Sequence, residues 1–356
     1  MPRANTQDLL QLSWQGILSD YVTALAWTPN GTLLAACSAC GEVVLFDART
    51  GTPTILQQEQ GQSVDVLSIS CDGKFLAAAG QSGTVKIWQI AGKSPDLLTQ
   101  LEQARVWVDR LQWNPRHPEL AFSVGRYVQV WDARTQTVIT TLNLETSSVL
   151  DLAWHPQGEQ LSVSGNQSVK TWHRQDWDDD PIVYKIGGAS VTIAWSPNGT
   201  YLASGNNDRT LLVWEQGNPY PWQMQGFPGK VRQLAWSTPI TKAGAPILAS
   251  ISAEGIVSWT KDADPSIGWN AQVLNQHRGR VTAIGFQPKS LLLASTAEDG
   301  QICLWNKAKQ IAQILQGLCK GFSNLSWNFQ GTTLATGGQQ GEVVIWKQQT
   351  RGKGFS

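Results

Sequence analysis

Four side chains that could do chemistry together fall within one short segment of this sequence. They are His277, Ser295, Asp299 and Trp305, all within residues 277–305. The chain has four histidines, and the other three offer no obvious partner. It has no nucleophile elbow, no glycine-rich phosphate loop after a strand and no histidine pair at metal-ligand spacing. We therefore predict no catalytic residues. His117 and His155 lie in proline-containing turns, which we expect to face solvent.

A second chemical signal comes from cysteines. Cys37 and Cys40 have C-x-x-C spacing, and Cys319 lies far along the chain. Clustered thiolates could bind zinc or form a redox pair. A lone C-x-x-C without a second pair is a weak signal, and Cys37 reads equally as a core residue. We predict no metal and no cofactor, and we keep these three cysteines only as a weak zinc candidate.

Composition limits the classes of partner. Lys plus Arg and Asp plus Glu are both 27, so the formal net charge is zero. Binding to nucleic acid usually needs a basic excess, so we predict no nucleic-acid partner. No apolar run reaches the roughly 20 residues of a membrane-spanning helix, and the N-terminus lacks a signal-peptide pattern. Five cysteines at irregular spacing fit reduced thiols. We expect a cytoplasmic protein.

The elements that must position these residues repeat along the chain. Residues 281–286, 291–295 and 302–305 are short runs with strand periodicity, joined by tight turns. The same three-run unit occurs eight times, about 41 to 50 residues apart, a period typical of four-stranded propeller blades. Thirteen of the eighteen tryptophans occupy two fixed positions, so we interpret them mainly as core residues. The first strands end at Trp27, Ile69, Trp113, Trp154, Trp195, Trp236, Phe286 and Trp327, and the third strands at Phe46, Trp88, Trp131, Trp172, Trp214, Trp259, Trp305 and Trp346.

A weaker fourth run follows most units and reads as an outer strand. Open sheet edges favour closure into a ring. These runs are Pro53–Gln57, Leu97–Leu101, Val138–Leu142, Ile182–Ile186, Gln272–Leu274 and Ile311–Leu315.

Strings such as VTIAWSPNGTYLASGNNDRTLLVW (Val191–Trp214) and VTALAWTPNGTLLAA (Val22–Ala36) resemble those of WD-repeat β-propellers. The repeats are degenerate, since the Trp-Asp pair occurs once, at residues 131–132. The resemblance implies one all-β domain over residues 1–356, with the eighth repeat ending near Trp346 and a short tail over 347–356. We predict eight blades of four antiparallel strands, closed by an N-terminal strand at about residues 9–15. Seven blades is the alternative.

The resemblance also assigns a role to the four side chains of residues 277–305. In this family a His, a Ser or Thr, an Asp and a Trp form a buried hydrogen-bond set within a blade. His277, Ser295, Asp299 and Trp305 match it in full, and Ser204, Asp208 and Trp214 match it in part. The resemblance therefore implies a structural role for these residues rather than a catalytic one.

Two surfaces are candidate docking sites. The turns entering each first strand and the turns joining second to third strands should share one face, called here the top face, which the resemblance marks as the usual docking surface. Trp107 is the sharpest candidate because it lies outside the repeated aromatic positions. The top-face candidates are Tyr21, Arg105, Trp107, Lys230, Arg278 and Arg280. Long loops of blades four to six form a second candidate, called here the rim, with Trp177, Tyr220, Trp222 and Trp269.

These observations favour a non-enzymatic scaffold that assembles other proteins through its loops. The alternative is a propeller that binds zinc or a small ligand at Cys37, Cys40 and Cys319 or in the central channel. A third class, a quinone-cofactor dehydrogenase, is disfavoured by the missing export signal and by tryptophan positions that fit WD repeats. The sequence alone names no partner.

Overall fold

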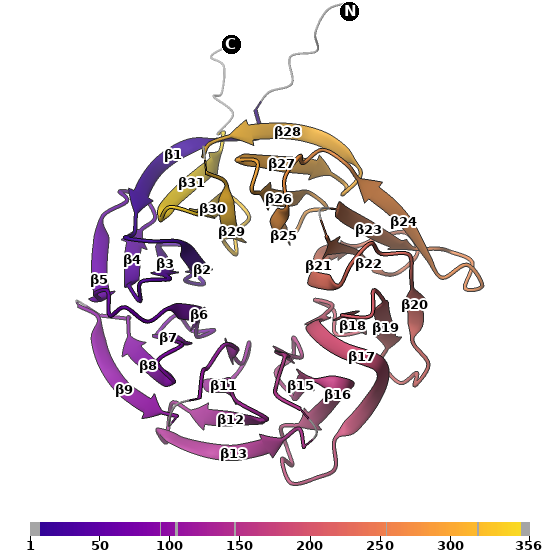
Figure 1. Ribbon diagram of the computed structural model, residues 1–356, viewed down its shortest axis with the longest axis horizontal. Helices are drawn as coiled ribbons and strands as arrows, with labels where there is room; N and C mark the ends of the chain where they lie inside the picture. The colour runs from indigo at the N-terminus through magenta and orange to yellow at the C-terminus, as the bar shows by residue number, and fades with distance from the viewer. Residues whose placement is uncertain are drawn as a thin grey trace, which may run out of the picture.

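The computed structural model describes residues 8–92, 94–103, 106–145, 147–253, 255–318 and 320–349. These residues form strands and turns arranged in a closed ring around a central opening (Figure 1). Hydrogen bonds join the described strands into six four-stranded sheets and one seven-stranded sheet, all antiparallel between neighbours. The all-β propeller expected from the sequence is confirmed.

The first four blades follow one another around the ring, each running outward from the central opening. Blade one contains β2 (Val22–Trp27), β3 (Leu33–Ser38), β4 (Val43–Asp47) and β5 (Pro53–Gln57). Blade two contains β6 (Val64–Ile69), β7 (Phe75–Gly80), β8 (Thr84–Gln89) and β9 (Asp96–Glu102). Blade three contains β10 (Leu111–Trp113), β11 (Glu119–Val124), β12 (Tyr127–Asp132) and β13 (Thr137–Asn143). Blade four contains β14 (Asp151–Trp154), β15 (Gln160–Ser164), β16 (Asn166–His173) and the first half of β17 (Ile182–Trp195).

The remaining blades complete the ring. Blade five contains the second half of β17, β18 (Tyr201–Asn206), β19 (Leu211–Glu215) and β20 (Trp222–Met224). Blade six contains β21 (Val231–Ile240), β22 (Pro246–Ser252), β23 (Gly255–Lys261) and β24 (Trp269–Leu274). Blade seven contains β25 (Val281–Phe286), β26 (Leu293–Ala297), β27 (Gln301–Asn306) and β28 (Gln310–Gln316). Blade eight contains β29 (Phe322–Trp327), β30 (Thr333–Gly338), β31 (Glu342–Gln348) and β1 (Leu10–Ile17).

One long strand explains why eight blades form only seven sheets. The first half of β17, to Ala189, pairs with β16 as the outer strand of blade four. From Ser190 the same strand pairs with β18 as the innermost strand of blade five. Its 14 residues run without a break, so the two blades share one continuous backbone. The ring therefore has the eight blades that the sequence predicted, and not the alternative number of seven.

The N-terminal strand closes the ring. β1 pairs antiparallel with β31, from Leu10 opposite Gln348 to Ile17 opposite Glu342. Figure 1 shows this indigo strand beside the yellow end of the chain. Leu10 is buried against blades seven and eight, and Gln313 accepts from the backbone N–H of Leu10 and donates to its carbonyl, at 2.9 Å in each case. The predicted closing strand is confirmed, and it is slightly longer than expected.

Burial changes from the inside of each blade to the outside. The second and third strands are almost wholly buried, as in β30, because neighbouring blades cover both of their faces. The outer strands are largely exposed, as in β13. This gradient explains why the second and third strands read as continuous apolar runs and the outer strands as weak ones. All six outer runs expected from the sequence form strands, whereas β20 in blade five was missed because it has only three residues.

The two tryptophan series have different partners. Five of the six tryptophans that end first strands donate through the indole Nε1 to the preceding blade, and Trp113 is the exception. Trp27 donates to the Ser326 carbonyl at 3.0 Å, and Trp154 to the Gln112 carbonyl at 3.1 Å. Three tryptophans that end third strands, Trp259, Trp305 and Trp346, instead donate to a hydroxyl on the second strand of their own blade, as Trp346 does to Thr336 Oγ1 at 3.1 Å. The first series therefore links blades, and these three members of the second series fasten the third strand of a blade to its second.

Deletion of residues 1–17 removes β1 and should strongly destabilise the protein. Blade eight would lose the ladder with β31 and the buried Leu10 side chain, and together these contribute several kcal/mol. We expect a fall in Tm of more than about 10 °C by calorimetry. Deletion of residues 1–7 is the matched control and should leave the Tm unchanged. Equal Tm values for the two deletions would contradict closure by β1.

Two tryptophans offer a matched test of the links between blades. Trp27 and Trp113 occupy the same repeat position and are both buried, but the Nε1 atom of Trp113 has no hydrogen-bond partner. Trp27→Phe leaves the Ser326 carbonyl without its donor, whereas Trp113→Phe removes an unpaired N–H. Trp27→Phe should therefore cost about 1–2 kcal/mol more in the free energy of unfolding, measured in urea. Equal losses of unfolding free energy in the two variants would show that the bond from Trp27 to the preceding blade contributes nothing to stability.

Candidate functional site

The turns predicted to form the top face do lie together. In several blades, the backbone N–H that follows the second strand donates to the carbonyl of the residue preceding the first strand. Ala39 donates to Tyr21 at 2.9 Å, and Glu298 donates to Arg280 at 3.0 Å. In those blades, these bonds hold the residue at the entrance of the first strand in a fixed place. The top face is therefore a set of short, tethered turns around the central channel.

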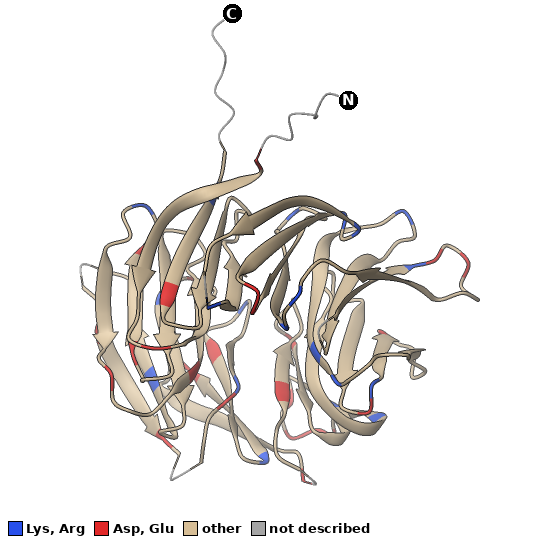
Figure 2. Cartoon of the chain, turned by 45° about the horizontal axis from the view of Figure 1, so that its top comes forward, with Lys and Arg blue, Asp and Glu red and all other residues tan. Residues whose placement is uncertain are grey.

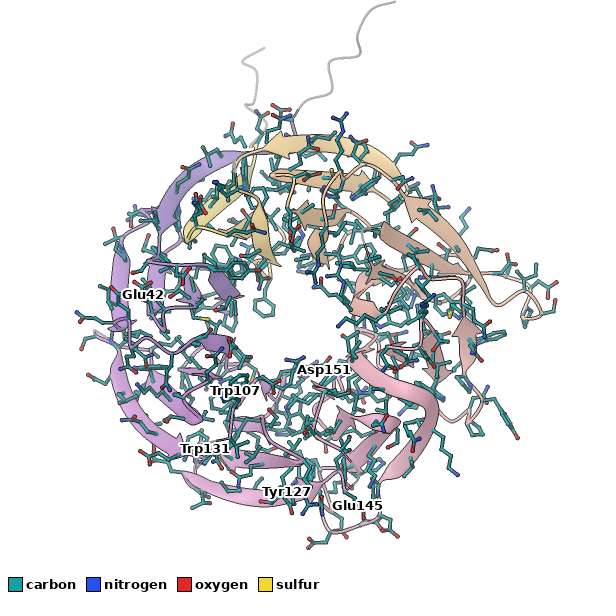
Figure 3. All side chains as sticks on the ribbon, viewed as in Figure 1. Glu42, Trp107, Tyr127, Trp131, Glu145 and Asp151 are labelled. Atoms are coloured by element: carbon teal, nitrogen blue, oxygen red, sulfur yellow. The ribbon has the colours of Figure 1, made fainter. Side chains whose placement is uncertain are left out.

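Trp107 stands out on this face because its side chain is 64% exposed. It lies in the connection entering blade three, beside the central opening (Figure 3). The flanking backbone is anchored, since Val108 is fully buried and its N–H donates to the Gly80 carbonyl at 3.1 Å. The sequence could not decide between an exposed Trp107 and one folded onto a neighbouring blade, and the structure places it in solvent.

Several basic side chains meet at the channel mouth. A hollow of about 420 Å³ is lined by Lys230 and Arg232 of blade six, Arg280 of blade seven and Arg110 of blade three. A second hollow, of about 340 Å³, shares the first three of these residues. The sequence predicted Lys230 and Arg280 for this face, and the structure brings the two together.

The other described residues predicted for the top face do not line the two hollows. Tyr21 is 37% exposed, and burial raises its pKa while the charge of Arg280 opposes the rise. The backbone N–H of Arg278 donates to Asp299 Oδ2 at 2.8 Å, but Arg278 does not line either hollow. Arg105 lies outside the described residues.

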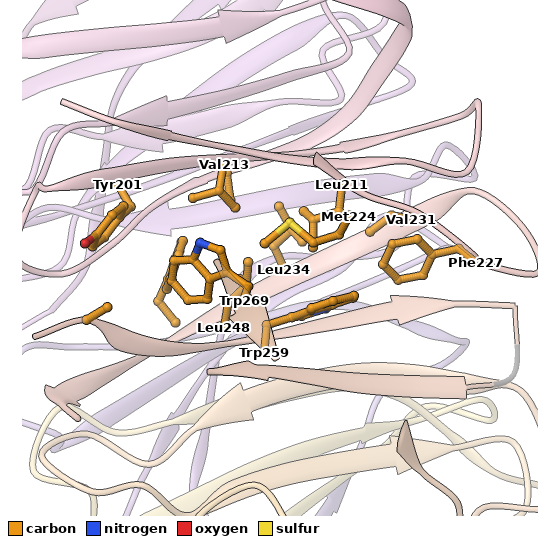
Figure 4. Packing of buried hydrophobic residues seen from close by; sticks show 13 residues of the cluster. Tyr201, Leu211, Val213, Met224, Phe227, Val231, Leu234, Leu248, Trp259 and Trp269 are labelled. Atoms are coloured by element: carbon orange, nitrogen blue, oxygen red, sulfur yellow. The ribbon is translucent and has the colours of Figure 1, made fainter. Parts of the chain in front are cut away.

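The rim prediction needs correction. Trp269 is only 9% exposed because it begins β24 and packs in the cluster between blades five and six (Figure 4). Trp222 begins β20 and packs against the same cluster, and Trp177 lies edge-on against Trp154, with 6.0 Å between ring centroids. The sequence placed Trp222 and Trp269 in loops because the short outer strands gave no clear pattern, whereas Trp177 does lie in the turn after β16. Only Tyr220, at 79%, is fully exposed.

The four side chains of residues 277–305 form one hydrogen-bonded chain. His277 Nδ1 lies 3.2 Å from Asp299 Oδ2, and His277 Nε2 lies 2.8 Å from Ser295 Oγ. Trp305 Nε1 donates to the same hydroxyl at 2.9 Å. Ser295 is fully buried, so its hydroxyl is covered from substrate. These hydrogen bonds join the segment before β25 to β26, to the turn after β26 and to β27. The arrangement offers no exposed nucleophile.

Two other sequence expectations concern histidine and cysteine. His155 is buried rather than solvent-facing, because its ring packs edge-on against Trp195 and its Nε2 lies 3.2 Å from the Gly199 carbonyl. Cys37 is buried in the core, and burial raises the pKa of its thiol to about 12. Cys40 Sγ instead donates to Asp20 at 3.4 Å. Cys319 lies outside the described residues.

Neither a cluster of metal ligands nor a long apolar helix occurs in the described part of the chain. No group of three His, Cys, Asp or Glu side chains there could hold a metal ion. No helix within the same residues is long and apolar enough to cross a membrane.

Sequence reasoning missed Arg110, which lies directly before β10, and Arg232, which lies at the start of β21, because neither occupies the position chosen as the candidate for its blade. A usable signal exists for Arg232, which directly follows the buried Val231 that opens β21. It also missed an ion pair between blades, in which Arg174 Nη2 lies 2.7 Å from Glu119 Oε1 and the Glu119 side chain is 2% exposed. The partners of that pair are 55 residues apart, so no local pattern marks them.

The geometry described so far defines a β-propeller, and comparisons with protein families identify its kind. The model "WD domain, G-beta repeat" matches residues 54–89, 136–173, 183–215 and 268–306. The model "Anaphase-promoting complex subunit 4 WD40 domain" matches residues 1–60. The two models together cover more than half of the chain. The chain belongs to the WD-repeat family.

Curated relatives share only part of the chain. Pre-rRNA-processing protein IPI3 of Mycosarcoma maydis is 26% identical over 40% of this chain and 29% of its own length. Echinoderm microtubule-associated protein-like 2 of Homo sapiens is 23% identical over 38% and 21%. Protein transport protein SEC13 of Chaetomium thermophilum is 24% identical over 42% and 37%. The matches cover less than two fifths of each of these relatives.

The buried histidines predict a pH-dependent stability. Burial lowers the pKa of both His277 and His155 below the ordinary 6.5, although Asp299 partly opposes the shift at His277. Below pH 6.5 the unfolded chain therefore binds more protons than the folded chain, so stability is complete above that pH and is lost as the pH falls.

We expect the Tm to fall by a few degrees between pH 7.5 and pH 5.5, measured by calorimetry. The double variant His277→Gln/His155→Asn should show a smaller fall over the same interval. His173 is exposed, so His173→Gln should keep the pH dependence of the wild type. A double variant with the full pH dependence would contradict this assignment.

Proposed function

We propose that this protein is a non-enzymatic scaffold that assembles other proteins by docking them on its top face. The observation that carries the proposal is Trp107, a large aromatic side chain that is 64% exposed on anchored backbone. Exposed tryptophans on a rigid surface are typical anchors of protein interfaces, because burying one in a partner gains much apolar area with little loss of conformational entropy. The surrounding turns are tethered, so a partner would meet a preformed surface.

The chemistry of the described residues supports the non-enzymatic part of the proposal. The one His–Ser–Asp arrangement is buried and committed to Trp305. The Cys37 thiol is held protonated by burial, which works against a thiolate nucleophile or zinc ligand there. Names of the relatives such as "Pre-rRNA-processing protein" and "Protein transport protein" differ widely, so we propose no pathway.

We also propose that the protein works in a reducing compartment such as the cytoplasm. The cysteines described, Cys37, Cys40, Cys71 and Cys303, are all free thiols, which is typical of proteins kept reduced.

Replacement of Trp107 by alanine should abolish most partner recovery. Tagged wild type and Trp107→Ala would be expressed in the source cell, and co-purifying proteins would be quantified by mass spectrometry. Loss of an aromatic anchor commonly costs about 2 kcal/mol or more, roughly a thirtyfold change in affinity.

Tyr220→Ala is the matched control, because Tyr220 is even more exposed but lies on the rim. It should keep the recovery of the wild type, and all three proteins should melt at the same temperature. Unchanged recovery with Trp107→Ala would refute docking at this residue, and selective loss with Tyr220→Ala would move the docking surface to the rim.

A further inference from the structure

The basic hollow at the channel mouth is a local concentration of charge in a protein with no net charge. Figure 2 shows Lys and Arg interspersed with Asp and Glu over most of the chain. By contrast, no Asp or Glu lines the larger hollow, within the residues that the structure describes. Its charged lining residues are Arg110, Lys230, Arg232 and Arg280.

Only one of these four cations has a carboxylate partner among the described residues. Arg110 Nε lies 3.3 Å from Asp151 Oδ1, and that aspartate also accepts from the Ile193 N–H at 2.9 Å. Asp151 therefore neutralises Arg110 and links blades three, four and five. No described carboxylate lies within 4.0 Å of the other three cations in a salt bridge.

The position of Arg232 is fixed by backbone acceptors. Its Nη2 donates to the Ala253 carbonyl and, at 3.3 Å, to the Val281 carbonyl of the next blade. Burial and the nearby charge of Arg280 lower the pKa of Arg232, and the Glu298 carboxylate partly opposes this shift. The two guanidinium groups are therefore close enough to repel each other. An anion between them would relieve this repulsion.

The neutral polar side chains of the same hollow are already satisfied. Gln233 bridges blades six and seven, with its Oε1 accepting from the Ile284 N–H at 3.0 Å. Asn324 bridges blades eight and one, with its Nδ2 donating to the Thr23 carbonyl at 3.1 Å. In contrast, the exposed side chains of Lys230 and Arg280 make no hydrogen bond to another described residue. The free donors of the hollow are therefore cationic.

We propose that this hollow receives an acidic segment of a partner protein, whose Asp or Glu carboxylates pair with Lys230, Arg232 and Arg280. The proposal rests on the proposed function, because the hollow opens among the same inner strands and turns as the top face. Arginine binds carboxylates through paired N–H donors, and three cations in one place favour several carboxylates on one segment. The basic side chains of this hollow are confined to the channel mouth, whereas a nucleic acid would need a basic groove that follows its backbone.

The test uses the full chain and a short fluorescein-labelled peptide of alternating Glu and Ser, with binding measured by fluorescence anisotropy at low salt. Wild type should bind this peptide and not its Gln–Ser counterpart, and added salt should weaken the complex. The double variant Lys230→Gln/Arg280→Gln should bind about tenfold more weakly, since two charge pairs at a partly screened site are lost. Both side chains are exposed, so this variant should keep the wild-type Tm.

Lys242→Gln/Lys309→Gln is the matched control. It removes the same charge from two exposed lysines in turns at the other ends of the strands, between β21 and β22 and between β27 and β28. It should bind the Glu–Ser peptide within about twofold of wild type, because distant exposed charges are screened. Equal weakening by both double variants would show a general charge effect and overturn the proposal.

Two further outcomes would also overturn it. One is wild type binding the Gln–Ser peptide as well as the Glu–Ser peptide, or neither. The other is tighter binding to a labelled oligothymidylate than to the Glu–Ser peptide, which would make the hollow a nucleic-acid site. The peptide measurement is separate from the Trp107 experiment. Partner recovery that depends on Trp107, together with no peptide binding, would end this inference and leave the proposed function standing.

Discussion

The contact between neighbouring blades is the constraint on which the rest of the structure depends. Each blade buries both faces of its middle strands, so it is complete only when a neighbour covers each side. Polar bonds fix the alignment of the two layers, as when Trp236 donates to the Ala194 carbonyl at 3.1 Å and Trp327 to the Gly285 carbonyl at 3.2 Å. Because a ring has no end blade, the same requirement is met everywhere only when β1 completes the last sheet.

The blades reach the same packing by different means, which is why the repeats are degenerate in sequence. Blade seven uses the full His277–Ser295–Trp305 chain, and blade eight keeps only the bond from Trp346 to Thr336. In blade three the Nε1 atoms of Trp113 and Trp131 are both unpaired, and their rings meet edge-on at 6.2 Å between centroids. Aromatic packing there replaces the polar bond. All blades share apolar burial. The fold therefore tolerates the loss of the polar residues that mark the repeat.

Sequence reasoning recovered the features that depend on local periodicity. The eight repeated units, the closing strand and six outer strands all follow from alternation and turn spacing over a few residues. It failed where the answer depends on a neighbouring blade. Trp269 reads as a loop residue, but blade five covers it, and His155 reads as a turn residue, but Trp195 of the next blade covers it. Sequence reasoning also gave no candidate at Arg232, a residue of β21 whose side chain borders a hollow.

The contacts between blades also separate the residues that hold the ring together from the residues that are free to bind a partner. At the inner strands most polar groups are used between blades, including Asp151 toward Ile193 and Gln233 toward Ile284. A side chain at this position is available to a partner only where the neighbouring blade does not need it. Lys230, Arg280 and Trp107 meet that condition on the top face, whereas the conspicuous His277 does not. Because the fold uses its most recognisable residues for its own stability, binding has to rely on residues in which one repeat differs from the others.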